Sequence, residues 1–140
     1  MERQHVDISR DLEGDPVVHA CFDLSEAEIG ASAHAVARSA DRFRNAETSA
    51  DEVLALRELT ALADELGELA GGAGTIVMRP ARLNAYSAAL GAFVESRDEA
   101  EWIRDEDREP LAIVRSLLYP LEQLSAEAMR AALSPLPRYG

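Results

Sequence analysis

The feature that most constrains the fold is a helical pattern over residues 49–72 with an unusually wide apolar arc. At about 100° per residue, its mostly apolar side chains share an arc of roughly 200°. They are Val53, Leu56, Leu59, Thr60, Leu62, Ala63, Leu66, Leu69 and Ala70. A surface helix needs an apolar stripe of only about 100°. A helix with so wide an arc has to be covered on two sides, so we predict that residues 49–72 are the central packing element.

Local patterns predict further helices and two short strands. Alternation of apolar and polar residues predicts strands at 17–24 and 75–79. Capping boxes, Ser25 with Glu28 and Ser49 with Glu52, mark two helix starts. Pro80 and Pro110 suit the first turn of later helices, and Pro120 should kink or split the last of these near 116–119. The predicted helices cover residues 25–45, 49–70, 80–97, 110–124 and 125–133.

These elements predict an α+β fold that is predominantly helical, with about five helices and a short two-stranded antiparallel ribbon. The 140 residues suit one domain. We expect a mobile acidic arm at 1–16, the domain at 17–133 and a tail at 134–140. The order strand, narrow-faced helix, wide-faced helix occurs twice, in halves 17–72 and 74–124. In that register Ile29 aligns with Leu83, which suggests a duplicated β-α-α unit.

The charge and residue inventory exclude several classes of function. A net charge of −12 disfavours binding to nucleic acid or to an anionic membrane, and it suits either a basic protein partner or simple solubility. All 14 basic residues are arginine, so P-loop and Schiff-base lysine chemistry is excluded. A single cysteine, no signal-like apolar start and no apolar run near about 20 residues indicate a cytoplasmic protein.

Five residues stand out as candidates for a functional site. His19 and Cys21 lie two apart on a predicted strand, so both side chains point the same way, and His34 could join them as a ligand. A metal site needs three or four converging ligands, so we assign no metal and no cofactor. The pattern Glu2-x-x-His5 has no second copy and carries no site. Trp102 and Ile103, embedded in an acidic run at 98–107, are candidate interaction residues.

The sequence contains no catalytic signature, because it lacks a Gly-x-Ser-x-Gly elbow and any spacing that assigns a triad. The first hypothesis is therefore a non-catalytic acidic interaction or regulatory protein that acts through its surface and through a homodimer interface. The alternative is a small-ligand or metal-binding protein, conceivably an enzyme, that uses His19 and Cys21 near the core between the two halves.

Overall fold

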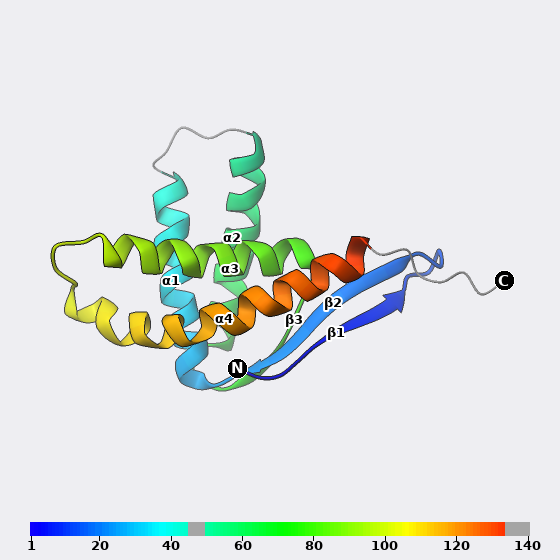
Figure 1. Cartoon of the computed structure of the whole chain (residues 1–140), viewed down its shortest axis with the longest axis horizontal. Helices are drawn as coiled ribbons and strands as arrows, with labels where there is room; N and C mark the ends of the chain where they lie inside the picture. The colour runs from blue at the N-terminus through cyan, green and yellow to red at the C-terminus, as the bar shows by residue number, and fades with distance from the viewer. Residues whose placement is uncertain (45–49, 134–140) are drawn as a thin grey trace.

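The computed structural model describes the backbone of residues 1–44 and 50–133, and the side chains of 1–41 and 56–133. Four helices and a three-stranded sheet make up these ranges (Figure 1). In chain order they are β1 (Glu2–Arg10), β2 (Pro16–Leu24), α1 (Glu26–Arg44), α2 (Ala50–Leu69), β3 (Gly74–Met78), α3 (Pro80–Asp98) and α4 (Asp105–Leu133). The prediction of an α+β, mostly helical fold is confirmed. The capping box at Ser49 and the tail at 134–140 lie outside the described residues.

The sheet has the order β1-β2-β3 with both pairs antiparallel. Its inner face is apolar, as the alternation in β2 predicts, and it joins the core through Val18, Ala20, Phe22, Leu24, Ile76 and Met78. The helices pack against this face, whereas the outer face consists of exposed or half-buried side chains.

Residues 1–16, which were expected to form a mobile acidic arm, contain a strand, so the expectation of only two strands is wrong. Residues Glu2–Arg10 form β1, which pairs with β2 over most of its length. A tight turn joins the two strands, in which the Asp11 carboxylate accepts the backbone N–H of Asp15 at 2.9 Å and Gly14 takes a φ of +83°. Because β1 is an edge strand with almost every residue exposed, it shows little of the apolar alternation that identifies a strand.

The central helix is α1, so the prediction that residues 49–72 hold that place is also wrong. α1 contacts α2, α3, α4 and β2. Its buried residues are mostly small: Ile29, Ala31, Ser32, Ala35, Val36, Ser39 and Ala40. Small side chains let neighbouring backbones approach on several sides, so a narrow apolar stripe can still be surrounded. In α2, only Leu59, Leu62 and Leu66 are buried among the described side chains, and the flanks of its wide arc are half-buried or exposed.

A single helix, α4, replaces the two helices expected between residues 110 and 133. It begins at Asp105, contains Pro110 and Pro120, and changes direction along its length (Figure 1). Pro120 removes one backbone hydrogen bond, but a continuous apolar stripe on both sides of it packs into the core. That stripe is Leu111, Val114, Leu117, Leu121, Leu124 and Ala128. Burial of this stripe outweighs the local cost of the proline.

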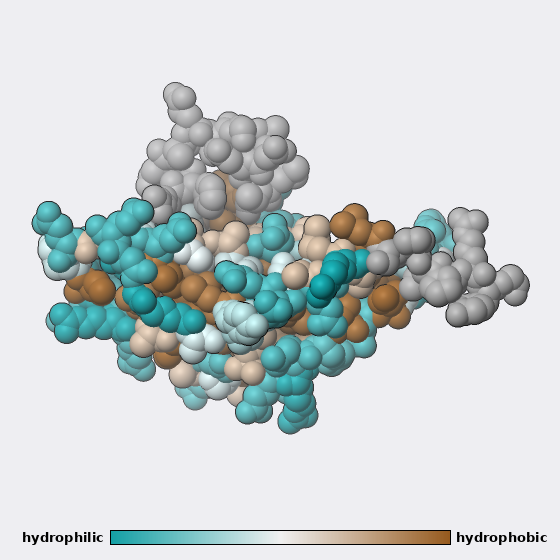
Figure 2. All heavy atoms as spheres, viewed as in Figure 1, coloured by the Kyte–Doolittle hydropathy of each residue, from teal (hydrophilic) through white to brown (hydrophobic). Residues whose placement is uncertain are grey.

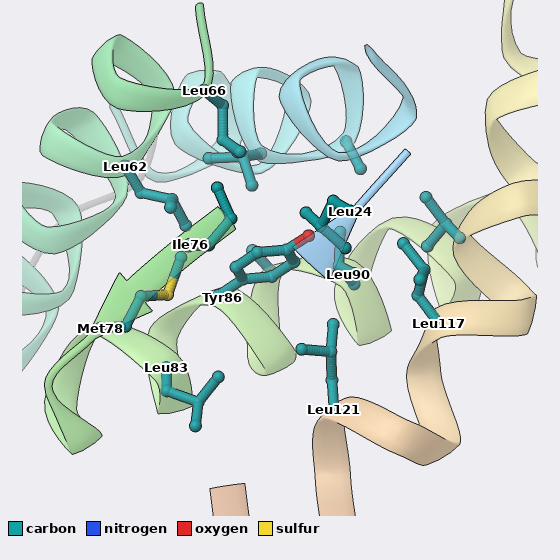
Figure 3. Close-up of a cluster of buried hydrophobic side chains, with 14 of the residues drawn as sticks. Leu24, Leu62, Leu66, Ile76, Met78, Leu83, Tyr86, Leu90, Leu117 and Leu121 are labelled. Carbon is teal, nitrogen blue, oxygen red and sulfur yellow. The ribbon is translucent and has the colours of Figure 1, made fainter. Parts of the chain in front are cut away.

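Core side chains from several elements pack around the buried ring of Tyr86 on α3. Figure 3 shows this ring inside a cluster of buried side chains from β3, α2 and α4, among them Ile76, Met78, Leu62, Leu66, Leu117 and Leu121. Phe22 of β2 packs edge-on against it, with ring centroids 6.2 Å apart. The Tyr86 hydroxyl forms a hydrogen bond with Ser32 of α1. This bond satisfies the polar atoms of both side chains inside an apolar core.

Candidate functional site

Four chemically versatile side chains gather on the outer face of the β1–β2 hairpin. His5 pairs with Cys21 across the two strands, and Asp7 pairs with His19. Because side chains alternate along a strand and directly paired residues share a face, all four lie on the side opposite the core. The inward-facing neighbours Val6 and Ala20 pair on the other side.

Three of these residues bring ligand-type atoms close together. His5 Nε2 lies 3.2 Å from Asp7 Oδ2, and the Cys21 thiol donates to the same oxygen at 3.7 Å. One nitrogen, one oxygen and one sulfur atom thus lie within 4.8 Å of one another. His5 and Asp7 are exposed and Cys21 is half-buried, so this cluster, the His5–Asp7–Cys21 cluster, is open to solvent.

The backbone around Arg3 orients the His5 ring. The register shifts between Glu2 and His5, and Arg3 takes a φ of +51°, which is uncommon for a residue with a side chain. His5 Nδ1–H donates to the Arg3 carbonyl at 2.9 Å. Nε2 lies 3.2 Å from the Asp7 carboxylate, and because a carboxylate only accepts, Nε2 donates in this contact when it carries a proton. The hydrogen bond to the Arg3 carbonyl, supported by the nearby Asp7 carboxylate, raises the pKa of His5.

The Cys21 thiol is not activated as a free nucleophile. Its partial burial and the neighbouring Asp7 carboxylate both raise its pKa, because each disfavours a thiolate. A reactive cysteine has a lowered pKa and a positive environment. The surroundings of Cys21 are the opposite of this, since the nearest charged group is the Asp7 carboxylate.

Of the three predicted ligand residues, only Cys21 belongs to the cluster, whose other members are His5 and Asp7. His19 and Cys21 do point the same way, but they lie on the outer face and not near the core. His34 lies on α1, on the other side of the sheet, and does not join them. His5 was considered only in the Glu2-x-x-His5 pattern and was set aside, and Asp7 was missed, because residues 1–16 were interpreted as an arm. The signal was present, since His5-x-Asp7 mirrors His19-x-Cys21 on either side of a turn.

His34 belongs instead to an ionic cluster around the buried Asp107 carboxylate, which joins three helices. Its Nε2 lies 2.6 Å from Asp107 Oδ1 on α4, and the Asp107 carboxylate is fully buried. Arg97 of α3 donates to Asp107 Oδ2 at 3.0 Å, and Arg38 lies 3.5 Å from Oδ1. Burial raises the pKa of Asp107, but the His34 hydrogen bond and the arginine charges outweigh it, so the net shift is downward. This cluster is a structural anchor for α1, α3 and α4.

A second surface feature is an acidic groove of about 730 Å³ between the N-terminal parts of α1 and α4. Its apolar lining is Ala27, Ala31, Pro110 and Ile113, and its carboxylates are Glu26, Asp105, Glu106 and Glu109. No cationic side chain lines this groove within the described part of the chain. Gly30 also lines the groove, and a Cβ placed there would have no atom within 4 Å.

The predicted interaction residues lie in the connection between α3 and α4. Trp102 is 71% exposed, and Ile103 packs partly against the core. Hydrophilic side chains cover much of the face seen in Figure 2, with smaller hydrophobic areas between them. An exposed tryptophan in such a setting suits an interaction role, which stays a prediction.

Comparison with protein-family models, with curated proteins and with solved structures yields no match to this chain. Among the described residues, no helix has both the length and the apolar content that crossing a bilayer requires.

Proposed function

We propose that the chain is a non-catalytic acidic interaction protein that binds a basic partner in the groove between α1 and α4. The observation that carries this proposal is the lining of the groove, where four carboxylates border an apolar floor. Such a lining suits an amphipathic basic segment, whose apolar side chains meet the floor while its cationic groups meet the carboxylates.

The ion pairs around the groove leave part of its charge available. Glu106 accepts a hydrogen bond from Arg38, and Asp105 lies 3.4 Å from Arg108. Glu26 and Glu109 make no ion pair with any residue whose side chain is described. The net charge of −12 would also speed encounter with a cationic partner.

The test is binding of a labelled amphipathic peptide of arginine and leucine, followed by fluorescence anisotropy. The double variant Glu26→Gln/Glu109→Gln should weaken binding about tenfold, since each lost charge contact contributes roughly 0.5–1 kcal/mol. The matched control, Glu122→Gln/Glu127→Gln, removes two exposed charges of α4 outside the groove. Equal weakening by both pairs would refute the groove as the site and leave only general charge attraction.

Three finer expectations from the sequence stay predictions. A homodimer could form by addition of strands at β1, which is an exposed edge of the sheet. The duplicated unit is supported by the order β2-α1-α2 followed by β3-α3-α4. It is also supported by the bond between Ser32 and Tyr86, which are 54 residues apart, the separation of Ile29 and Leu83. A cytoplasmic location is the third.

A further inference from the structure

We propose that the His5–Asp7–Cys21 cluster is a binding site for a transition-metal ion of the Zn²⁺ type. The site is separate from the acidic groove, since it lies on the outer face of the sheet and the groove lies between α1 and α4. His5 Nε2, one Asp7 carboxylate oxygen and Cys21 Sγ are the three protein ligands. The fourth position is open to water or to an incoming ligand, because the cluster is exposed.

The donor types select the class of metal. Imidazole nitrogen, carboxylate oxygen and thiolate sulfur are the three donors that Zn²⁺ takes from proteins. Mg²⁺ and Ca²⁺ prefer all-oxygen sites, so a set with one sulfur and one nitrogen disfavours them. When the ion binds, the Cys21 thiol and a protonated His5 Nε2 each release their proton to solvent, and no oxidant or reductant is involved.

Two of the three separations between ligand atoms already match those of a tetrahedral site, and the third, between His5 Nε2 and Cys21 Sγ, is below 4.8 Å. With metal–ligand bonds of 2.0–2.3 Å, the edges of a tetrahedron measure roughly 3.3–3.8 Å. The observed separations are 3.2 Å between His5 Nε2 and Asp7 Oδ2 and 3.7 Å between Cys21 Sγ and Asp7 Oδ2. An ion can therefore enter with small side-chain rotations, and the paired strands need not move.

The hydrogen bond from His5 to the Arg3 carbonyl supports the same assignment independently. A histidine that binds a metal through one ring nitrogen usually donates the other N–H to a carbonyl or carboxylate, which fixes the ring and its tautomer. Here His5 Nδ1 lies 2.9 Å from the Arg3 carbonyl oxygen, and Nε2 faces the cluster. The unusual φ of Arg3 and the register shift beside it place this carbonyl where the ring needs it. The arrangement resembles a ligand prepared before the ion arrives.

The acidic turn between β1 and β2 offers the main competing position on the hairpin. Carboxylate oxygens of Asp11, Glu13 and Asp15 also lie within 4.8 Å of one another. The Asp11 carboxylate, however, already accepts two backbone N–H groups of the turn, from Glu13 and Asp15. A group of exposed carboxylates without nitrogen or sulfur offers no preference for Zn²⁺. It serves instead as the control position.

The experiment uses Co²⁺ as a spectroscopic probe on the full chain. Thiolate bonded to Co²⁺ gives a charge-transfer absorption in the near ultraviolet, and the chain has one cysteine, so such a band reports Cys21 alone. We expect one Co²⁺ per chain, displaced by Zn²⁺. Cys21→Ser should abolish the band, and His5→Ala and Asp7→Asn should weaken Co²⁺ binding about tenfold or more. Glu13→Gln, on the turn, should change the affinity for Co²⁺ by less than about twofold.

Three results would overturn the proposal. The first is the absence of the thiolate band in the wild-type chain. The second is a band whose strength and Co²⁺ affinity survive both His5→Ala and Asp7→Asn, which would make Cys21 an isolated ligand. The third is one Co²⁺ per two chains with dimers in light scattering, which would indicate two bridging thiols. Circular dichroism should show that each variant folds, because the substituted side chains are exposed or half-buried.

Discussion

Replacing Asp107 by asparagine should destabilise the protein more than any comparable change at an acidic residue on the surface. The Asp107 carboxylate is fully buried and links α4 to His34 of α1 and Arg97 of α3. Asparagine has nearly the same shape, but it has one oxygen instead of two. It can accept one of the two hydrogen bonds, and its amide N–H₂ then faces a donor.

The expected loss follows from these two bonds. A hydrogen bond that involves a charged group contributes roughly 1.5–3 kcal/mol to stability. The side chains of His34 and Arg97 are 28% and 26% exposed, so they can recover part of this through water. We therefore expect the free energy of unfolding to fall by about 2 kcal/mol, near the lower end of that range. For a domain of this size that corresponds to a fall in Tm of about 6 °C.

Urea unfolding followed by circular dichroism measures this loss directly. The matched control is Asp105→Asn, two residues earlier on α4, where the carboxylate is 95% exposed and lies 3.4 Å from Arg108. That change should cost less than about 0.5 kcal/mol. The reasoning would be refuted if the two variants lost equal stability, or if Asp107→Asn unfolded at the wild-type urea concentration.

The difference in stability between wild type and Asp107→Asn should also depend on pH. The pKa of Asp107 in the folded chain is lowered, so its contribution to stability is fully present above the unfolded-state pKa of about 3.9. The contribution is lost as the pH falls further, through the lowered pKa of the folded state. The stability difference between wild type and Asp107→Asn should therefore persist at neutral pH and shrink below about pH 4. A difference that grew on acidification would contradict this sign.

Two further predictions concern the core. Tyr86→Phe leaves the buried Ser32 hydroxyl without its partner, so it should lower the free energy of unfolding in urea by about 1–2 kcal/mol. The control Tyr119→Phe, at a ring that is 71% exposed, should lower it by less than about 0.5 kcal/mol. Similar losses for the two tyrosines would be inconsistent with a role for the buried hydrogen bond. Leu121→Ala should lower the free energy of unfolding by about 2–5 kcal/mol, whereas Leu133→Ala, at the exposed end of α4, should have little effect. If Leu121→Ala had little effect too, the apolar stripe across Pro120 would not be what holds α4 together.

Sequence reasoning succeeded where the controlling interactions are local. Ser25 and Glu28 form the predicted capping box, with the Glu28 N–H 3.2 Å from Ser25 Oγ and the Ser25 N–H 2.9 Å from Glu28 Oε1. Gly71 takes a φ of +98° just after α2 ends, as a glycine stop requires. In both cases the energy comes from residues a few positions apart, so the pattern is sufficient.

The errors arose where packing between distant residues overrides the local pattern. Pro120 was expected to kink or split a helix, and a separate last helix was expected after it, but burial of Leu117 and Leu121 on either side keeps α4 continuous. The His5–Asp7–Cys21 cluster depends on the register of β1 against β2, and the nearly uniform exposure of β1 leaves no apolar pattern from which to infer that register. The cluster could have been found only by assuming a hairpin across the turn at 11–15.

The division of the sheet into an inner and an outer face also bears on how such a chain can evolve. The volume and polarity of the core constrain the side chains on the inner face, so substitutions there lower stability. Those on the outer face, including His5, Asp7 and Cys21, contribute little to folding, because they are exposed or half-buried. Binding chemistry can therefore be gained, exchanged or lost on this face while selection for a stable fold acts almost entirely on the other.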